Sequence, residues 1–300
     1  MKDSPRRTIR VALVAGTAIG ALVLSACGSS STTDSSTSAA AGPTVSASSG
    51  PEIDAVKAAL VDPSALTMCT SLSYKPFEFT EGDQVVGFDV DLVGLTAGAL
   101  GVEVKVIDTP FEGIKSGDAM ATGKCDLAAA AMSITPEREK AILFSEPYYD
   151  AEQTLVVGVD STATSLADMR GKRIAGQTGT TGLDYLNENK DANGYEIVEY
   201  QDFPSQSDAL ATGQVDGAVQ DFPVINQFVN DNSSVVKIVA TFATEDQYGI
   251  GMKLGNDALK SLVDASIAQA KADGTFDALV TKWIGPSAAA TGSSTAPSSN

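Results

Sequence analysis

The segment LAAAAMSITPER, residues 127–138, decides the fold class of this chain. Its first half is an apolar run typical of a buried strand, and this run leads directly into a polar segment that begins at Ser133. Thr135 is a favoured N-cap residue and Pro136 a favoured first helical residue, so a helix is predicted to begin there with Arg138 in its first turn. A strand followed at once by a helix is the repeating unit of α/β sheet proteins.

The same alternation of short apolar runs and helical periodicity continues on both sides of this segment. Strands are predicted at residues 66–70, 85–88, 102–107, 173–176 and 217–220. Helices are predicted from an N-cap at Asp89 to Gly101, and at residues 111–122, 182–187 and 205–212. We therefore expect an α/β protein with two sheets, one on each side of about residue 150.

The composition excludes several functions. The chain has 300 residues, of which 43% are hydrophobic, which is enough for two domains with real cores. It contains no histidine, so a Ser-His or Cys-His catalytic pair and a histidine metal site are excluded. The 38 acidic residues outnumber the 20 basic ones, which argues against binding to nucleic acid. No cofactor and no metal are expected.

The N-terminus has the pattern of a secretory signal. Four basic residues stand within the first ten, and an apolar run of 14 residues, Val11 to Leu24, follows them. A membrane-spanning helix needs about 20 apolar residues, so a retained membrane anchor is disfavoured. The sequence Leu24-Ser25-Ala26-Cys27 resembles the lipobox of bacterial lipoproteins. This resemblance implies that residues 1–26 are removed and that Cys27 is lipidated, anchoring the protein outside the cytoplasm.

Two stretches are too poor in apolar residues to form a core. Residues 27–50 are dominated by Ser, Thr, Ala and Gly, and we expect them to be a flexible tether. Residues 286–300 have the same character and are expected to be a disordered tail. The folded part is therefore predicted to span residues 51–285.

Four polar segments follow predicted strands. They are Ser71 to Tyr74, Ser133, Gln177 to Thr181, and Asp221. Open α/β sheets bind ligands beyond the carboxyl ends of their strands, so two facing sheets would bring these segments into one cleft.

Two charged residues in these regions each allow two interpretations. Arg138 is either an exposed side chain paired with Glu137 or Glu139, or a residue that grips an anion in a bidentate fork. Asp221 either caps the helix that follows it or binds a cation.

Eight short stretches carry a resemblance to a known family. They are YKPFEF (74–79), VGFDVD (86–91), PFEG (110–113), AMSITPER (131–138), FSEPYY (144–149), GTT (179–181), YGI (248–250) and KWIG (282–285). In order and spacing they resemble the polar amino-acid-binding receptors of bacterial ABC importers. The resemblance covers residues 66 to 285.

This resemblance implies a two-lobed fold of the periplasmic-binding-protein type II, with a mixed sheet flanked by helices in each lobe. One lobe would comprise residues 51–149 and 247–285 and the other residues 150–246, joined by crossings near residues 148–152 and 246–250. The implied function is to capture a polar or charged amino acid and deliver it to an ABC import permease with its ATPase. The protein would act as a monomer and not as an enzyme. The alternatives are an amino-acid-sensing lipoprotein and a cyclohexadienyl-dehydratase-like enzyme.

The resemblance also implies which residues hold the common part of an amino acid. Arg138 would bind the α-carboxylate, helped by Ser133 and by the backbone N–H of Thr181. Asp221 would bind the α-ammonium together with the backbone carbonyl of Ala131.

Other positions would contact the ligand side chain. Tyr74 and Phe111 would enclose it from two sides. Ser71 stands where members that bind cationic or amide side chains often have an acid, and Gln177 stands at a variable position. Two further acids that would favour a cationic ligand, unless they face solvent, are Glu78 and Glu112.

The remaining two cysteines, Cys69 and Cys125, lie in or next to strands that are neighbours in the resembled fold. We predict that they form a disulfide, which an exported protein can retain. Two buried thiols are the alternative.

Overall fold

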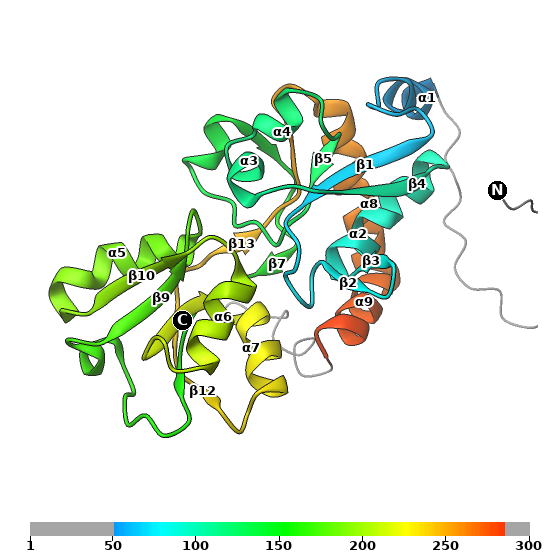
Figure 1. Cartoon of the computed structure of the whole chain (residues 1–300). Helices are drawn as coiled ribbons and strands as arrows, with labels where there is room; N and C mark the ends of the chain where they lie inside the picture. The colour runs from blue at the N-terminus through cyan, green and yellow to red at the C-terminus, as the bar shows by residue number, and fades with distance from the viewer. Residues whose placement is uncertain (1–50, 286–300) are drawn as a thin grey trace, which may run out of the picture. The chain divides into compact units, whose positions relative to one another are not determined.

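The computed structural model describes residues 51–285, and these contain two five-stranded sheets (Figure 1). The spatial order in the first sheet is β4 (Glu103–Asp108), β1 (Ala65–Thr70), β5 (Leu127–Ala128), β14 (Gly251–Lys253) and β6 (Ile142–Phe144). The order in the second is β10 (Glu196–Tyr200), β9 (Arg173–Gln177), β11 (Gly217–Asp221), β8 (Gln153–Gly158) and β12 (Val236–Phe242). Both sheets mix parallel and antiparallel pairs, which confirms the predicted α/β class with two mixed sheets.

Helices flank each sheet, and each sheet with its helices forms one lobe. The first lobe contains α1 (Pro51–Ala58), α2 (Phe88–Leu100), α3 (Phe111–Lys115), α4 (Asp118–Ala121), α8 (Asp257–Asp273) and α9 (Thr275–Trp283). It also has the hairpin of β2 (Phe79–Glu81) and β3 (Gln84–Val86). The second lobe contains the 3-10 turn η2 (Leu166–Met169), α5 (Thr181–Asn193), α6 (Phe203–Ala211) and α7 (Phe222–Asp231). Within residues 51–285, every helix is too short or too polar to cross a membrane.

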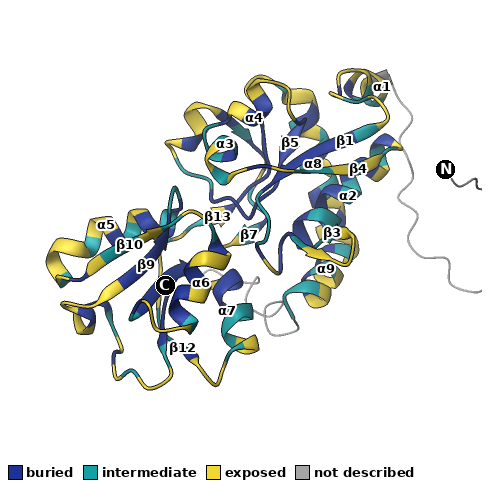
Figure 2. Cartoon of the chain, viewed as in Figure 1, coloured by how far each residue is buried: buried dark blue, intermediate teal, exposed yellow. Residues whose placement is uncertain are grey.

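Strand β1 shows how the core is built. Successive side chains of a strand point to opposite faces, and both faces of β1 are covered. Leu66 and Met68 pack into the core beneath α2, whereas Cys69 packs on the other face with Ile114 and Met120. Figure 2 shows the central strands buried and the outward sides of the helices exposed. Because both faces are covered, such strands read as continuous apolar runs in the sequence.

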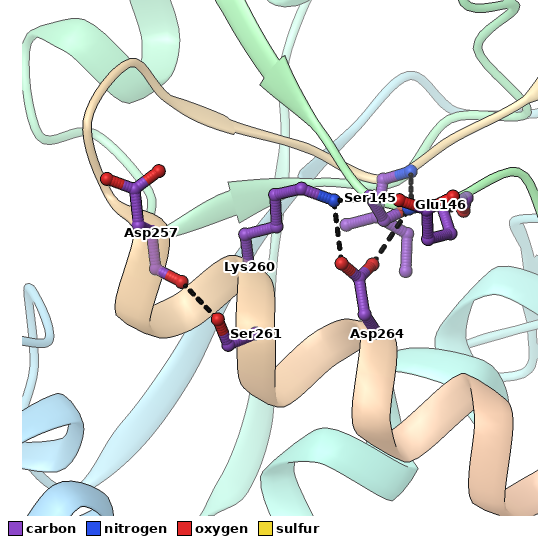
Figure 3. Close-up of polar contacts among 7 residues, drawn as sticks. Ser145, Glu146, Asp257, Lys260, Ser261 and Asp264 are labelled. Atoms are coloured by element: carbon purple, nitrogen blue, oxygen red, sulfur yellow. Dashed lines mark hydrogen bonds and ion pairs between the residues drawn. The ribbon is translucent and has the colours of Figure 1, made fainter.

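Two short strands carry the chain between the lobes. β7 (Tyr149–Asp150) and β13 (Gln247–Tyr248) pair with each other in antiparallel fashion. The segment before β7 is tied to α8, since the backbone N–H of Glu146 donates to Asp264 at 2.8 Å and Asp264 also pairs with Lys260 at 2.6 Å (Figure 3). The first crossing therefore begins at a segment that hydrogen bonds fix to the first lobe. The exact lobe boundaries given above stay a prediction.

The structure corrects the start of the helix predicted from Asp89 to Gly101. The strand predicted at 85–88 is β3 and ends at Val86, because Gly87 has a φ of 139° and turns the chain into α2. Because Gly87 has no side chain, its backbone can also lie close to the backbone of Phe77. Asp89 lies inside the helix and is buried, so its prediction as an N-cap was wrong. The predicted end of this helix at Gly101 is confirmed.

Two other predicted helices are shorter than expected. The helix predicted at 111–122 is divided into α3 and α4 at Gly117, which has a φ of 80° and lies against the carbonyl of Ala141. The helix predicted to begin after Thr135 is only a 3-10 turn, η1 (Arg138–Lys140). Thr135 still accepts a hydrogen bond from the N–H of Arg138 at 3.2 Å, as a capping residue would. The turn that begins at Thr135 was thus predicted correctly, but its continuation as an α-helix was not.

Cys69 and Cys125 form the predicted disulfide, with their Cα atoms 5.7 Å apart. The bridge joins β1 to the segment that enters β5, its parallel neighbour in the sheet. It closes a loop with a sequence separation of 56 residues within the first lobe.

Replacing both cysteines with alanine is expected to lower the free energy of unfolding by about 4 kcal/mol, because a loop of this length is no longer closed in the unfolded chain. Urea unfolding of the two proteins under oxidising conditions measures the difference. As a control, adding reductant should lower the stability of the natural protein and leave the double variant unchanged. Recovery of both cysteines as free thiols from the natural protein, by non-reducing peptide mapping, would refute the bridge.

Candidate functional site between the lobes

A cavity with about 330 Å³ of unfilled space is lined by residues of both lobes. The lining residues are Ser71, Tyr74, Glu78, Phe111, Ala130, Ala131, Ser133, Arg138, Gln177, Thr180 and Thr181. Eight of the nine residues predicted to bind a ligand are among them. The ninth, Asp221, does not line the cavity.

The strand ends place these residues. Ser71 directly follows β1, and Gln177 and Asp221 are the last residues of β9 and β11. Ser133 comes after β5 and forms an isolated bridge with Tyr248 of the second crossing. Polar side chains therefore gather where strands of the two sheets end, as expected for open α/β sheets.

Arg138 is buried, with 7% of its surface exposed. Its guanidinium donates to the backbone carbonyl of Ser133 at 2.6 Å and to that of Gly179, in the other lobe, at 3.0 Å. It lies 5.5 Å from the ring centre of Phe111. The interpretation as an exposed arginine paired with Glu137 was wrong, because Glu137 pairs with Lys140 instead.

In residues 51–285 no carboxylate lies within ion-pair distance of the Arg138 guanidinium. Burial lowers its pKa, and the more distant charge of Asp221 opposes this effect. A buried cation without an anion is costly, so the site is electrostatically prepared for an anionic group.

Three contacts join the lobes around the cavity. The Tyr74 hydroxyl donates to the side-chain oxygen of Gln220 at 2.9 Å. The hydroxyls of Ser133 and Thr181 are 3.3 Å apart, and the third contact is the hydrogen bond from Arg138 to Gly179. These contacts hold the two lobes together across the cavity.

The turn before α5 contributes a helix N-terminus to this site. Thr180 is the N-cap and accepts a hydrogen bond from the N–H of Leu183 at 3.3 Å. Thr181, which lines the cavity, is therefore the first helical residue, whose N–H finds no partner inside the helix. An anion held by Arg138 would meet this N–H from the opposite lobe.

Asp221 is buried and takes part in a polar network that the sequence did not reveal. Its two oxygens accept hydrogen bonds from the Gln153 side chain and from the Tyr248 hydroxyl, each at 2.6 Å. Asp221 makes no side-chain cap for α7, so the capping interpretation was wrong. Gln153 also donates to Thr181 at 3.1 Å, which connects Asp221 to the cavity lining.

The two acids singled out in the sequence have different surroundings. Glu112 faces solvent, with 70% of its side chain exposed, and pairs with Lys115. Glu78 is fully buried, lines the cavity, and has no hydrogen-bond donor at either carboxylate oxygen. Burial, followed by the nearby charge of Asp89, raises the pKa of Glu78 well above its usual range. Glu78 is thus an acid in the cavity that still needs a partner.

Comparisons with known proteins agree with this geometry. Residues 66–286 match the model of the bacterial extracellular solute-binding proteins, family 3, and the chain belongs to that family. It is 28% identical over 224 residues to a putative ABC transporter arginine-binding protein of Escherichia coli K12, covering 73% of this chain and 90% of that one.

Solved structures show the same fold. An ancestral arginine-binding protein bound to arginine is 33% identical, with a TM-score of 0.69 over 74% of this chain and 99% of its own. An ancestral amino acid-binding protein described as a precursor of cyclohexadienyl dehydratase is 32% identical, with a TM-score of 0.68 over 74% of this chain and 96% of its own.

The buried carboxyl of Asp221 makes the stability of the ligand-free protein depend on pH. Burial, the largest cause, raises its pKa from 3.8 to about 6. The native state therefore binds more protons than the unfolded chain between these values, so this group lowers the stability as the pH rises from 4 to 6. As the pH rises from 4 to 6, the free energy of unfolding of Asp221→Asn should increase by about 2 kcal/mol relative to that of the natural protein. Urea unfolding at a series of pH values measures it.

Asp168→Asn is a control of opposite sign, because hydrogen bonds from Thr164 and Ser165 lower the pKa of that exposed carboxyl. This variant should lose stability relative to the natural protein as the pH rises. If the Asp221→Asn difference is constant from pH 4 to 7, the carboxyl of Asp221 has an ordinary pKa in the native state.

Proposed function

We propose that this protein captures an amino acid with a cationic side chain between its two lobes and delivers it to an ABC import permease with its ATPase. Membership of a family of extracellular solute-binding proteins supports the capture role. The observation that carries the ligand class is Glu78, a fully buried carboxyl that lines the cavity without a hydrogen-bond donor. Relatives from Escherichia coli and Bacillus subtilis whose names describe arginine binding support the same class.

The groups shared by all amino acids would be held at the lobe junction. Arg138, which lacks an anionic partner within residues 51–285, would bind the α-carboxylate with Ser133 and the N–H of Thr181. Asp221 would bind the α-ammonium with the carbonyl of Ala131. Asp221 lies behind the lining, so the ammonium would reach it beside Gln153 and restore the charge that burial disfavours.

The side chain of the ligand would lie between the two aromatic lining residues, Tyr74 and Phe111. Its cationic end would meet Glu78, while Ser71 and Gln177 would adjust the fit. A charge-assisted hydrogen bond to Glu78 would contribute about 1.5–3 kcal/mol, which corresponds to roughly 10- to 150-fold in affinity.

We propose no catalytic role. The similarity to a precursor of cyclohexadienyl dehydratase is a similarity to a protein that is itself described as amino acid-binding. Turnover of prephenate or arogenate by the purified protein would establish the enzyme instead.

A panel of amino acids in a thermal-shift assay tests the ligand class. A ligand at 100 times its Kd stabilises the native state by about 2.7 kcal/mol, which is a rise in Tm of about 5–10 °C for a domain of this size. L-arginine or L-lysine should give this rise, and Arg138→Ala should abolish it. Glu78→Gln should weaken the binding of cationic ligands by at least about 10-fold while that of L-glutamine stays within a few-fold.

Arg173→Ala is the matched control for Arg138→Ala, because Arg173 is exposed at the start of β9. It should bind as the natural protein does. Stabilisation by no amino acid at all, or full binding by Arg138→Ala, would overturn the assignment.

We propose that Cys27, which lies outside the described residues, anchors the mature protein to the outer face of the membrane after removal of residues 1–26. The lipobox-like sequence Leu24 to Cys27 supports this proposal. A monomer at the end of the 27–50 tether would then meet its permease in the same membrane.

Cys27→Ala should move the protein from the membrane fraction to the soluble extracytoplasmic fraction, because the acyl chains supply the anchor. Ser29→Ala, two residues further along, should stay with the membrane. Detergent phase partitioning of both variants measures the distribution, and membrane retention of Cys27→Ala equal to that of the natural protein contradicts the anchor.

A further inference from the structure

Two carboxyl groups lie side by side beneath the cavity. Glu78 precedes β2 and lines the cavity, and Asp89 is the second residue of α2. The backbone N–H of Asp89 donates to the carbonyl of Phe77 at 3.0 Å, which holds the two segments together. Both side chains are fully buried. Neither forms an ion pair with any Lys or Arg of residues 51–285.

The two groups differ in their hydrogen bonds. Asp89 accepts from the backbone N–H of Ala131 at 2.8 Å and from the Tyr148 hydroxyl at 2.7 Å. Glu78 receives no hydrogen bond from any donor, and the polar group it meets is the carboxyl of Asp89. A hydrogen bond between two carboxyl groups requires a proton on one of them. Glu78 is therefore satisfied in the empty cavity only when it carries that proton and donates it to Asp89.

The other titratable groups around Glu78 donate their hydrogen bonds elsewhere, so none of them satisfies its carboxyl in place of this proton. Tyr74 and Tyr148 face it, but their hydroxyls already donate to Gln220 and Asp89. Arg138 opens on the same cavity and donates to carbonyls of both lobes. Burial raises the pKa of Asp89 to about 6 and that of Glu78 well above its usual range, which is consistent with a proton on Glu78.

We propose that Asp89 is a positioning residue for ligand selection, which keeps Glu78 in its acid form while the cavity is empty, so that a cationic side chain enters in exchange for one proton. This inference rests on the proposed cationic ligand. In the step the O–H bond of Glu78 breaks and its proton passes to water or buffer. The carboxylate left behind pairs with the guanidinium or ammonium, which remains charged, and no electrons are transferred.

The exchange gives binding a defined pH dependence. Protons compete with the cationic ligand, so its affinity should rise about tenfold per pH unit below the pKa of Glu78 in the empty protein, and level off above it. A neutral ligand of the same shape should lack this contribution, since the acid form of Glu78 can donate to it, and should keep only the dependence that Asp221 would give to every amino acid. Selection for cationic ligands should therefore be strongest at high pH.

Calorimetric titration tests the exchange. The full mature chain is titrated with L-arginine and with L-citrulline, its neutral isostere, from pH 5.5 to 8.5. Each titration is made in two buffers with different ionisation enthalpies, so that the protons released per ligand are counted. Asp221 would face the α-ammonium of both ligands and contribute equally to both titrations, so we expect arginine to release about one more proton than citrulline at low pH. Arginine binding with the same proton release and pH profile as citrulline would overturn the inference and leave the proposed function standing. Absence of arginine and lysine binding would overturn both.

Three substitutions assign the proton. Glu78→Gln should abolish the difference in proton release between arginine and citrulline and give arginine the pH profile of citrulline. Asp89→Asn removes the neighbouring anion, so the rise in affinity should move to lower pH. Asp91→Asn is the matched control in the same helical turn, because Asp91 faces outward and pairs with Lys282. It should behave as the natural protein does.

Proton release by Glu78→Gln equal to that of the natural protein, or an unshifted profile for Asp89→Asn, would overturn the assignment. If Asp89→Asn does not fold, the proton counts of the natural protein and of Glu78→Gln decide the matter.

Discussion

The buried guanidinium of Arg138 is the charge around which the two lobes are organised. Removing a cation from water is costly, and carbonyl dipoles compensate it only in part. Here one carbonyl comes from each lobe, Ser133 from the first and Gly179 from the second, so the charge is satisfied best when the lobes are closed. An α-carboxylate at this point would supply the missing anion and strengthen the same closure. In the proposed function, ligand binding and lobe closure would thus be linked through a single side chain.

The acids of the site are arranged as a counterpart to this cation. Asp89 in the first lobe and Asp221 in the second each accept a hydrogen bond from a tyrosine of a crossing segment, Tyr148 and Tyr248 respectively. The rings of these tyrosines lie 6.0 Å apart. Asp89 and Asp221 are therefore fixed relative to the crossing segments, whereas the third buried acid of the site, Glu78, receives no hydrogen bond at either carboxylate oxygen. This difference separates acids that hold the structure from an acid that is available to a ligand.

Local patterns predicted the parts of the fold that depend on neighbouring residues. The strands near 66–70, 173–176 and 217–220 are present because apolar runs of that length are buried on both faces of a sheet. The strand near 102–107 lies at the edge of the first sheet and was predictable from its alternating pattern. The end of α2 was predictable because Gly101 adopts the left-handed conformation that glycine favours. The division between α3 and α4 was not, since it depends on the approach of Ala141 to Gly117. The role of Asp89 was missed for the same reason, because its partners lie 42 and 59 residues away.

The sequence by itself determined the family, the two-sheet α/β architecture and the polar residues that follow the strands. These features depend on short motifs and on the periodicity of apolar residues, both of which can be recognised without the structure. It also determined the disulfide partners once the resembled fold was known. Only the tertiary structure decided that Glu78 is buried and Glu112 exposed, and that Asp221 is held by Gln153 and Tyr248. Burial and hydrogen-bond partners are properties of the packed chain, and they decide which of several similar acids is left to meet a ligand.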